Sequence, residues 1–443
     1  MPVSDIKFSR KKLKNGMELV TAPMLKNPTI TAIILFKIGS CYEDEKYAGI
    51  SHFLEHIVFK GNKLYRNPLE LSAAVDSLGG RYNAFTSKEY TGFYIKVGAE
   101  YLDIALEWLG QLVTTPLIPD QDVEMERNVI LEEINMYNDT PTAQIGYIFE
   151  ELVFPGSTLG RNIIGTKKSL IGIKKSEITK HFRSNYYPSN AVLAIAGDLG
   201  ELGEQKVNKY FKFLKKDSKQ AFEDKVGAPS PRIRLHFTKV SDDGARAKRV
   251  KTFYKKTDQT HLMLGAKTFS YLDKRRYLLS VISAIMGGGM SSWAFTEIRE
   301  KRGLAYYVRS STDLYKDMGA YSIGAGLNND KLELAVKEIM KLFKRIREKG
   351  VSARDLKKAK DQLIGGMLLN RETSEDIATT LVSDVISYGE VTPFSEDVRI
   401  IKRISQSEIK RLAQEFFAPE RLQLAMIGPW KKKDEEKFEK LLK

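Results

Sequence analysis

The stretch Gly49-Ile50-Ser51-His52-Phe53-Leu54-Glu55-His56-Ile57-Val58-Phe59-Lys60-Gly61 carries two histidines and a glutamate at helical spacing. In a helix, His52 and His56 at i and i+4 share one face, and Glu55 lies beside them. Neutral imidazole nitrogens suit zinc, and a catalytic zinc takes three protein ligands and keeps one position open. The pattern therefore predicts two metal ligands on one helix and a third ligand elsewhere in the chain.

Glu55 is placed to act as a base rather than as a ligand, because a carboxylate between two ligands reaches a water molecule on the metal. The alternative is that these are ordinary helical residues, which is the usual explanation for a lone histidine on an apolar face. Two histidines and a glutamate spaced as H-x-x-E-H, the inverted zincin (inverzincin) motif, favour the metal site.

Composition limits the class of protein. The chain has 443 residues, 42% of them hydrophobic and 29% charged, which is typical of a globular protein with more than one domain. Residues 1–15 lack the apolar segment of a secretory signal, and no stretch is apolar enough to span a membrane, so a cytoplasmic location is expected. A single cysteine, Cys41, excludes a disulfide within the chain. The net charge of +15 comes without a nucleic-acid-binding motif, so a solvated basic surface is expected rather than specific nucleic-acid binding.

The first half of the sequence alternates strand and helix patterns. Segments within residues 17–39 are rich in β-branched residues and predict strands, and 82–87 and 90–97 predict a strand pair. Helices are expected at 67–78, at about 100–113, and at 120–137 after Pro119.

The helix predicted at 120–137 offers carboxylates for the missing ligand. Glu126 and Glu133 are seven residues apart and project from one face, with Glu132 turned away. Residue composition alone does not choose among them and Glu124.

An internal repeat relates the two halves of the chain. Ala191-Val-Leu-Ala-Ile-Ala-Gly197 resembles Leu422-Gln-Leu-Ala-Met-Ile-Gly428, and Ser176-Glu-Ile recurs as Ser407-Glu-Ile at the same offset of 231 residues. We therefore expect an α+β protein with two homologous units, each a mostly antiparallel sheet with helices packed on one side. The expected domains are 1–220 with the zinc site, a linker with a connecting strand at 221–258, and 259–443. Because no histidine follows His261, the second unit lacks the metal site.

These motifs resemble the M16 metallopeptidase family, which includes pitrilysin, insulysin and the mitochondrial processing peptidase β subunit. The resemblance covers nearly the whole chain. In that family a ligand glutamate follows H-x-x-E-H after about 76 residues, and 76 residues lie between His56 and Glu133. The resemblance thus implies one zinc ion per chain on His52, His56 and Glu133, with Glu126 orienting a ligand.

The resemblance also implies how substrate is held. An R-x6-Y element in the second domain matches Arg299 and Tyr306, which would bind substrate backbone and stabilise the oxyanion. The segment Asn83-Ala84-Phe85-Thr86 is similar to the edge strand that binds substrate by strand addition.

Two repeats, where large members have four, imply the half-length class. In that class two chains pair as the halves of a clamshell, with a composite active site in trans. A homodimer is expected, with a heterodimer with an inactive paralogue as the alternative.

The expected function is zinc-dependent hydrolysis of peptides or unfolded polypeptides inside an enclosed chamber, with Glu55 activating the water bound to zinc. The alternative is a non-catalytic scaffold or partner subunit of an M16-type complex. Retention of the whole zinc motif favours the peptidase.

Overall fold

The computed structural model describes residues 5–212 and 248–443, which form two compact units. Within this described part, unit 1 comprises residues 5–135, 161–212 and 369–394, and unit 2 comprises residues 136–160, 248–368 and 395–443. Residues 221–247 of the expected linker lie outside the described part of the chain. The rest of the expected linker contains Val250–Tyr254, which form the first strand of unit 2.

Unit 1 is built on a mixed sheet in the order β1-β2-β6-β3-β5-β4. The pair β2–β6 is parallel and the other neighbours are antiparallel. The strands are β1 (Ser9–Lys12), β2 (Glu18–Pro23), β3 (Thr29–Phe36), β4 (Arg81–Thr86), β5 (Thr91–Gly98) and β6 (Ala191–Gly197). The predicted strands in residues 17–39 and the predicted pair at 82–97 are confirmed, and β4 lies at an edge of the sheet.

Unit 2 repeats this topology. Its sheet has the order β7-β11-β8-β10-β9, again with one parallel pair, β7–β11, followed by antiparallel neighbours. The strands are β7 (Val250–Tyr254), β8 (Gln259–Thr268), β9 (Ala305–Leu314), β10 (Gly319–Asn328) and β11 (Gln423–Gly428). Each strand from β7 to β11 corresponds in order to one from β2 to β6, so the internal repeat found in the sequence is a repeat of structure.

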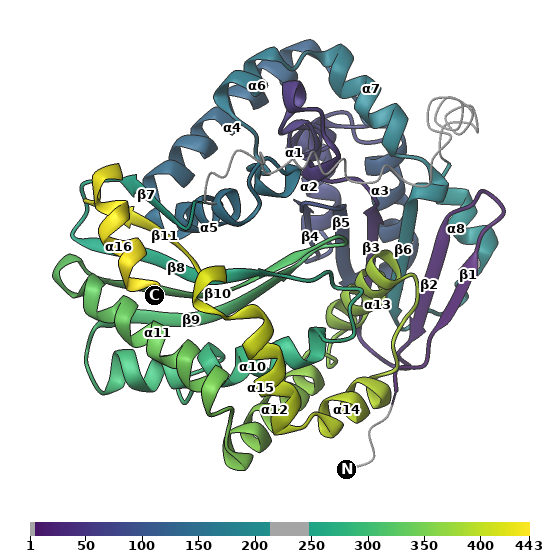
Figure 1. Cartoon of the computed structure of the whole chain (residues 1–443). Helices are drawn as coiled ribbons and strands as arrows, with labels where there is room; N and C mark the ends of the chain where they lie inside the picture. Colours follow the sequence, from purple (N-terminus) through teal and green to yellow (C-terminus); the bar gives the residue numbers. More distant parts are fainter. Residues whose placement is uncertain (1–4, 213–247) are drawn as a thin grey trace, which may run out of the picture. The chain divides into compact units, whose positions relative to one another are not determined.

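Helices surround each sheet (Figure 1). Unit 1 contains α1 (Ile50–Ile57), α2 (Pro68–Asp76), α3 (Leu102–Thr114), most of α4 (Asp120–Asp139), α6 (Lys167–Gly172), α7 (Lys175–Asn185), α8 (Glu204–Tyr210) and α13 (Ser374–Tyr388). Unit 2 contains α5 (Pro141–Val153), α10 (Arg276–Gly287), α11 (Leu332–Glu348), most of α12 (Ala353–Leu369) and of α14 (Phe394–Arg403), α15 (Gln406–Phe416) and α16 (Glu435–Leu441). The helices predicted near 67–78, 100–113 and 120–137 are confirmed as α2, α3 and α4.

The two halves of the chain exchange one helix each. Helix α5 follows α4 in the first half of the sequence but packs on β11, β8 and β7 of unit 2. Helix α13 comes from the second half and packs on β3, β6 and β2, the equivalent strands of unit 1. Buried Ile33 and Leu35 of β3 face α13, whereas Phe36 on the opposite face stacks on Tyr186. Helix α13 therefore covers a second sheet face, in addition to the single helical layer that the sequence predicted.

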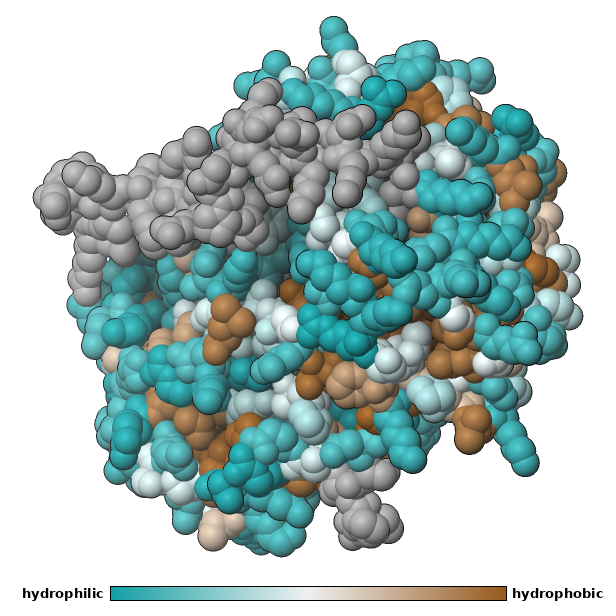
Figure 2. Space-filling view, turned by 90° about the vertical axis from the view of Figure 1, so that its right-hand side faces the viewer, coloured by the Kyte–Doolittle hydropathy of each residue, from teal (hydrophilic) through white to brown (hydrophobic). Residues whose placement is uncertain are grey.

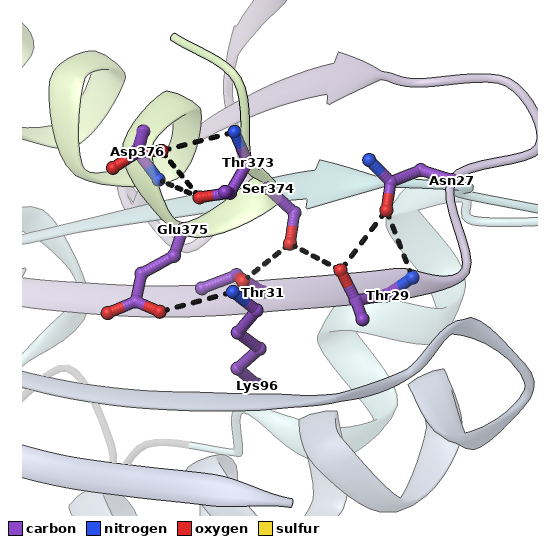
Figure 3. Close-up of polar contacts among 8 residues, drawn as sticks. All are labelled: Asn27, Thr29, Thr31, Lys96, Thr373, Ser374, Glu375 and Asp376. Carbon is purple, nitrogen blue, oxygen red and sulfur yellow. Dashed lines mark hydrogen bonds and ion pairs between the residues drawn. The ribbon is translucent and has the colours of Figure 1, made fainter. Parts of the chain in front are cut away.

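Polar contacts fix the start of α13 on the sheet of unit 1 (Figure 3). The buried Ser374 hydroxyl lies 2.9 Å from the Thr31 hydroxyl and 3.1 Å from that of Thr29. Beside it, Lys96 of β5 forms an ion pair with Glu375 at 3.3 Å. These side chains hold a helix from one end of the sequence against strands from the other.

On the face shown in Figure 2, hydrophilic side chains predominate and hydrophobic ones occur in small groups. Across residues 5–212 and 248–443, no helix has both the length and the apolar character needed to cross a membrane.

Candidate metal centre

The motif forms helix α1, as predicted. Its inward face is buried through Ile50, Phe53, Leu54 and Ile57, which leaves His52, Glu55 and His56 on the other face. The helix begins after Gly49, whose φ of 95° lies in the left-handed region, where a Cβ would approach the Ile164 carbonyl oxygen to 2.5 Å. Glycine is therefore required where the chain enters the helix.

A buried carboxylate holds the start of this helix. The two oxygens of Glu43 accept hydrogen bonds from the backbone N–H groups of Gly49 and Ser51, at 2.7 and 2.8 Å. These N–H groups have no partner within the helix, so the Glu43 side chain satisfies donors that would otherwise stay unpaired. Glu43 thus fixes the first turn of the helix that carries the histidines.

Helix α4 brings a third potential ligand to the histidines. Glu133 Oε2 lies 3.7 Å from His52 Nε2 and 3.6 Å from His56 Nε2. Ligand atoms of the three side chains all lie within 4.8 Å of one another. Two ligands about 2.1 Å from one zinc ion in tetrahedral geometry are roughly 3.4 Å apart, so the donor set fits zinc with little rearrangement. Glu133, rather than Glu124 or Glu132, is the α4 residue in this group.

The second carboxylate of α4 orients one imidazole. His56 Nδ1 lies 3.0 Å from Glu126 Oε2, and because a carboxylate only accepts, the imidazole donates. The proton is thereby placed on Nδ1, which leaves the Nε2 lone pair directed toward the Glu133 side. Glu126 is 5% exposed, and its other oxygen forms an ion pair with Lys60. By contrast, His52 Nδ1 is buried and has no hydrogen-bond partner among the described residues.

Glu55 is held by the edge strand β4. The Thr86 hydroxyl donates a hydrogen bond of 2.6 Å to Glu55 Oε2. This hydrogen bond holds Glu55 on the same face of α1 as the two histidines.

The electrostatics of the site favour neutral imidazole at His52. Burial, together with the neighbouring His56, lowers the pKa of His52 to about 3. For His56, burial acts to lower the pKa, but the hydrogen bond to Glu126 and the charges of Glu133 and Glu55 outweigh it, so its pKa is raised. Burial raises the pKa of Glu55, and the Thr86 hydrogen bond opposes part of that change. A raised carboxyl pKa is suited to general acid–base chemistry near neutral pH.

The remaining residues predicted on β4 divide between its two faces. Thr86 points toward α1, whereas the Phe85 ring packs against the core beneath α13 and meets Tyr90 edge-on. Ala84 is buried. The backbone N–H of Ala84 donates a hydrogen bond of 2.9 Å to the side-chain oxygen of Asn83. Contact of Asn83, Ala84 and Phe85 with substrate stays a prediction.

The predicted pair Arg299 and Tyr306 belongs to unit 2. Arg299 lies on a π-helical turn, Phe295–Glu300, with its guanidinium 4.9 Å from the Phe295 ring and 5.8 Å from the Tyr306 ring. Tyr306 is 76% exposed on β9, which is an edge strand. The two side chains are thus neighbours on an accessible part of this unit.

Two contacts at the centre were not anticipated from the sequence. Glu43 carried no motif signal, because its role depends on the loop that returns it to Gly49 and Ser51. Thr86 was assigned to substrate binding, and its hydrogen bond to Glu55 became visible only when β4 and α1 were placed side by side.

Comparison with known proteins identifies the family of the chain. The family model described as insulinase (peptidase family M16) matches residues 20–167, and the model for the peptidase M16 inactive domain matches residues 172–363. An uncharacterized zinc protease of Streptomyces coelicolor is 31% identical over 96% of this chain and 90% of its own length. The uncharacterized zinc protease YmxG of Bacillus subtilis is 29% identical over 95% of this chain and 98% of its own.

Solved structures share the fold across the chain. A protease from Helicobacter pylori aligns with a TM-score of 0.87 at 24% identity, covering 96% of this chain and 100% of that one. The M16 inactive-domain protein from Pseudomonas fluorescens aligns with a TM-score of 0.82 at 17% identity, covering 96% and 98%. With both M16 models and full-length relatives matched, the chain belongs to the M16 family of zinc metallopeptidases, in its half-length class.

Proposed function

We propose that this protein is a zinc-dependent endopeptidase that hydrolyses peptides or unfolded polypeptide segments. The observation that carries the proposal is the grouping of His52, His56 and Glu133 around one point, with Glu55 beside them and fixed by Thr86. The full-length relatives are named as uncharacterized zinc proteases, and these names support the same reaction class.

The chain's residues divide the work of hydrolysis. When bound to His52, His56 and Glu133, zinc supplies a Lewis acid that lowers the pKa of water toward about 7 and polarises the peptide carbonyl. Glu55 accepts the proton of the attacking water, whose oxygen bonds to the carbonyl carbon. As the C–N bond breaks, Glu55 passes that proton to the leaving amine. Glu126 keeps His56 in the tautomer that presents Nε2.

Substrate would lie extended along β4, with its backbone paired to the strand edge at Asn83–Thr86. An edge strand offers unpaired N–H and C=O groups, and Thr86 links that edge to Glu55. Binding through the backbone suits peptides that lack folded structure.

The proposed assembly is a dimer that encloses a chamber, in which Arg299 and Tyr306 of one chain complete the site of the other. The exposure of Tyr306 on an edge strand supports this role, since the hydroxyl is accessible to a substrate oxyanion.

The central test is cleavage of a quenched-peptide library by the purified protein before and after chelation, with zinc restored and with Glu55→Gln in parallel. Chelator-sensitive cleavage that zinc restores and that falls about 10²–10⁴-fold in Glu55→Gln supports the proposal. If one zinc ion binds per chain and no arm shows cleavage, the proposal fails in favour of a scaffold or partner subunit.

A mixing experiment tests the composite site. Glu55→Gln and Tyr306→Phe are each expected to be inactive as homodimers. With sites shared in trans, random mixing restores about a quarter of the wild-type sites, because half the dimers are hybrid and each hybrid has one intact site. If each site is formed within one chain, mixing restores nothing.

A further inference from the structure

The internal repeat allows the space beneath α13 in unit 1 to be compared with the space beneath α5 in unit 2. The comparison uses rungs, meaning rows of residues paired across neighbouring strands. In unit 1, the strand registers align Ala194, Ile33, Tyr94 and Asn83 across the sheet. In unit 2 the equivalent rung is Ala425, Met263, Gly324 and Arg309. Because the two rungs share one topology, each residue of one has a counterpart in the other.

Three aromatic residues fill this space in unit 1. Phe85, Tyr90 and Tyr94 pack against the core formed by α13 and the sheet. Continuing the two registers from this rung pairs each ring with a residue of unit 2. Ser311 corresponds to Phe85, Ala320 to Tyr90, and Gly324 to Tyr94. Unit 2 thus has three small residues where unit 1 has three rings.

Figure 3 shows the contacts that fix the start of α13 in unit 1. Among the described residues of unit 2, two of the corresponding positions lack the side chains that make these contacts. The helices α5 and α13 both begin after a threonine, so Pro141 corresponds to Ser374. The registers place Gly326 where Lys96 lies. Proline and glycine carry neither the hydroxyl nor the ammonium group that anchors α13.

A cavity of about 330 Å³ lies in unit 2 between α5 and the sheet. Ser311, Ala320 and Gly324 all line it, so the small residues account for the space. The cavity is also lined by the apolar residues Ile145, Phe149, Phe154 and Met263. Exposed Arg309 and Asp313 lie on the β9 side of the cavity, and Glu150 lies on α5.

We propose that this cavity, defined by Ser311, Ala320, Gly324 and the apolar residues of α5 and β8, is a binding site for an aromatic side chain of a peptide. Equivalent space in unit 1 holds aromatic rings, which argues for an occupant of that shape. The volume lies near the lower end for ligand pockets and suits a side chain rather than a large cofactor. Met263 adds a polarisable sulfur, which favours contact with a ring.

Polar groups near the cavity fit a peptide as the carrier of that ring. Arg309 can donate to main-chain carbonyls, and carboxylates such as Asp313 can accept from main-chain N–H groups. The choice of a peptide rests on the proposed function, whereas the preference for an aromatic ring rests on the cavity itself.

The test measures binding rather than cleavage. The probe is N-acetyl-4-fluorophenylalanine methylamide, followed by ¹⁹F NMR on the zinc-loaded protein, with N-acetylalanine methylamide as an unlabelled competitor and its phenylalanine analogue as the positive competitor. We expect saturable binding that the phenylalanine analogue displaces at a concentration at least about tenfold lower than the alanine analogue, since the ring supplies most of the buried apolar area.

Gly324→Tyr fills the cavity with the residue found in unit 1. A Cβ at Gly324 meets its nearest atoms at 3.8–4.0 Å, so the backbone accepts a side chain there. The variant should fold with an unchanged or higher Tm and bind the probe at least about tenfold more weakly. Ser311→Phe provides a second cavity-filling variant if Gly324→Tyr fails to fold.

Equal binding by the wild type and by a folded cavity-filling variant would overturn the proposal, as would absence of binding to the wild type or equal displacement by both competitors. Because no cleavage is measured, loss of the peptidase assignment would leave a positive binding result intact, and the two failures are distinguishable.

Discussion

Removing the carboxylate of Glu126 should weaken zinc binding without unfolding the protein. Glu126 accepts the 3.0 Å hydrogen bond from His56 Nδ1, and its own position is fixed by Lys60. Loss of such a partner of a metal ligand typically lowers metal affinity 10–100-fold, which corresponds to about 1.4–2.8 kcal/mol. Glu126→Gln keeps an acceptor oxygen but loses the charge, so about 10-fold is expected. Glu126→Ala removes the hydrogen bond as well, and about 100-fold is expected.

The assay is competition for zinc against a chromophoric chelator at fixed pH, with thermal melting of the metal-free proteins as the check on folding. Glu132→Gln is the matched control, because Glu132 is an exposed carboxylate on the same helix and outside the group of potential ligands. The reasoning is refuted if Glu126→Ala binds zinc as tightly as the wild type. It is also refuted if Glu132→Gln weakens binding equally.

Three further predictions concern contacts around the site and beneath the exchanged helix. Thr86→Val should lower kcat about 10-fold with KM and zinc content unchanged, because Glu55 loses its hydrogen bond. Thr86→Ser keeps the hydroxyl and should retain activity. A fully active valine variant would contradict the role of Thr86 in positioning Glu55. Ser374→Ala should reduce the free energy of unfolding by about 1–2 kcal/mol, because the Thr31 hydroxyl loses its partner, and an unchanged denaturation midpoint would count against this. Burial raises the pKa of Glu43 from 4.5 to about 7. Between these pH values the folded state holds a proton that the unfolded state has lost. The free energy of unfolding therefore falls, by up to about 3 kcal/mol, as the pH rises through this range. Glu43→Gln should flatten that part of the stability curve in denaturation at pH 5 and pH 8, and parallel curves would contradict it.

The motif helix α1 and its partner α4 could be predicted because their signals are local. His52, Glu55 and His56 share a face through helical periodicity alone, and α4 was visible as a long helix after Pro119. Choosing Glu133 on that helix required the spacing known from the family, since periodicity left Glu126 and Glu133 equivalent. Their different surroundings, with Lys60 beside Glu126, became apparent in the folded chain.

The repeat could likewise be read from matching strands, but the exchange of α5 and α13 could not. Both helices have an apolar face, and that pattern states that a helix is buried without stating which sheet buries it. The choice depends on complementary surfaces, such as Ser374 against Thr31, that are distant in sequence.

The sequence by itself thus determined the candidate metal-ligand residue types, the two-fold repeat and the elements predicted within residues 17–137, because each of these is recorded in residue spacing and pattern. Only the tertiary structure decided that Glu43 holds the motif helix, that Thr86 holds Glu55, and that a cavity lies beneath α5. These features arise from contacts between segments distant in the chain, and such contacts are governed by shape and polarity that no local pattern records.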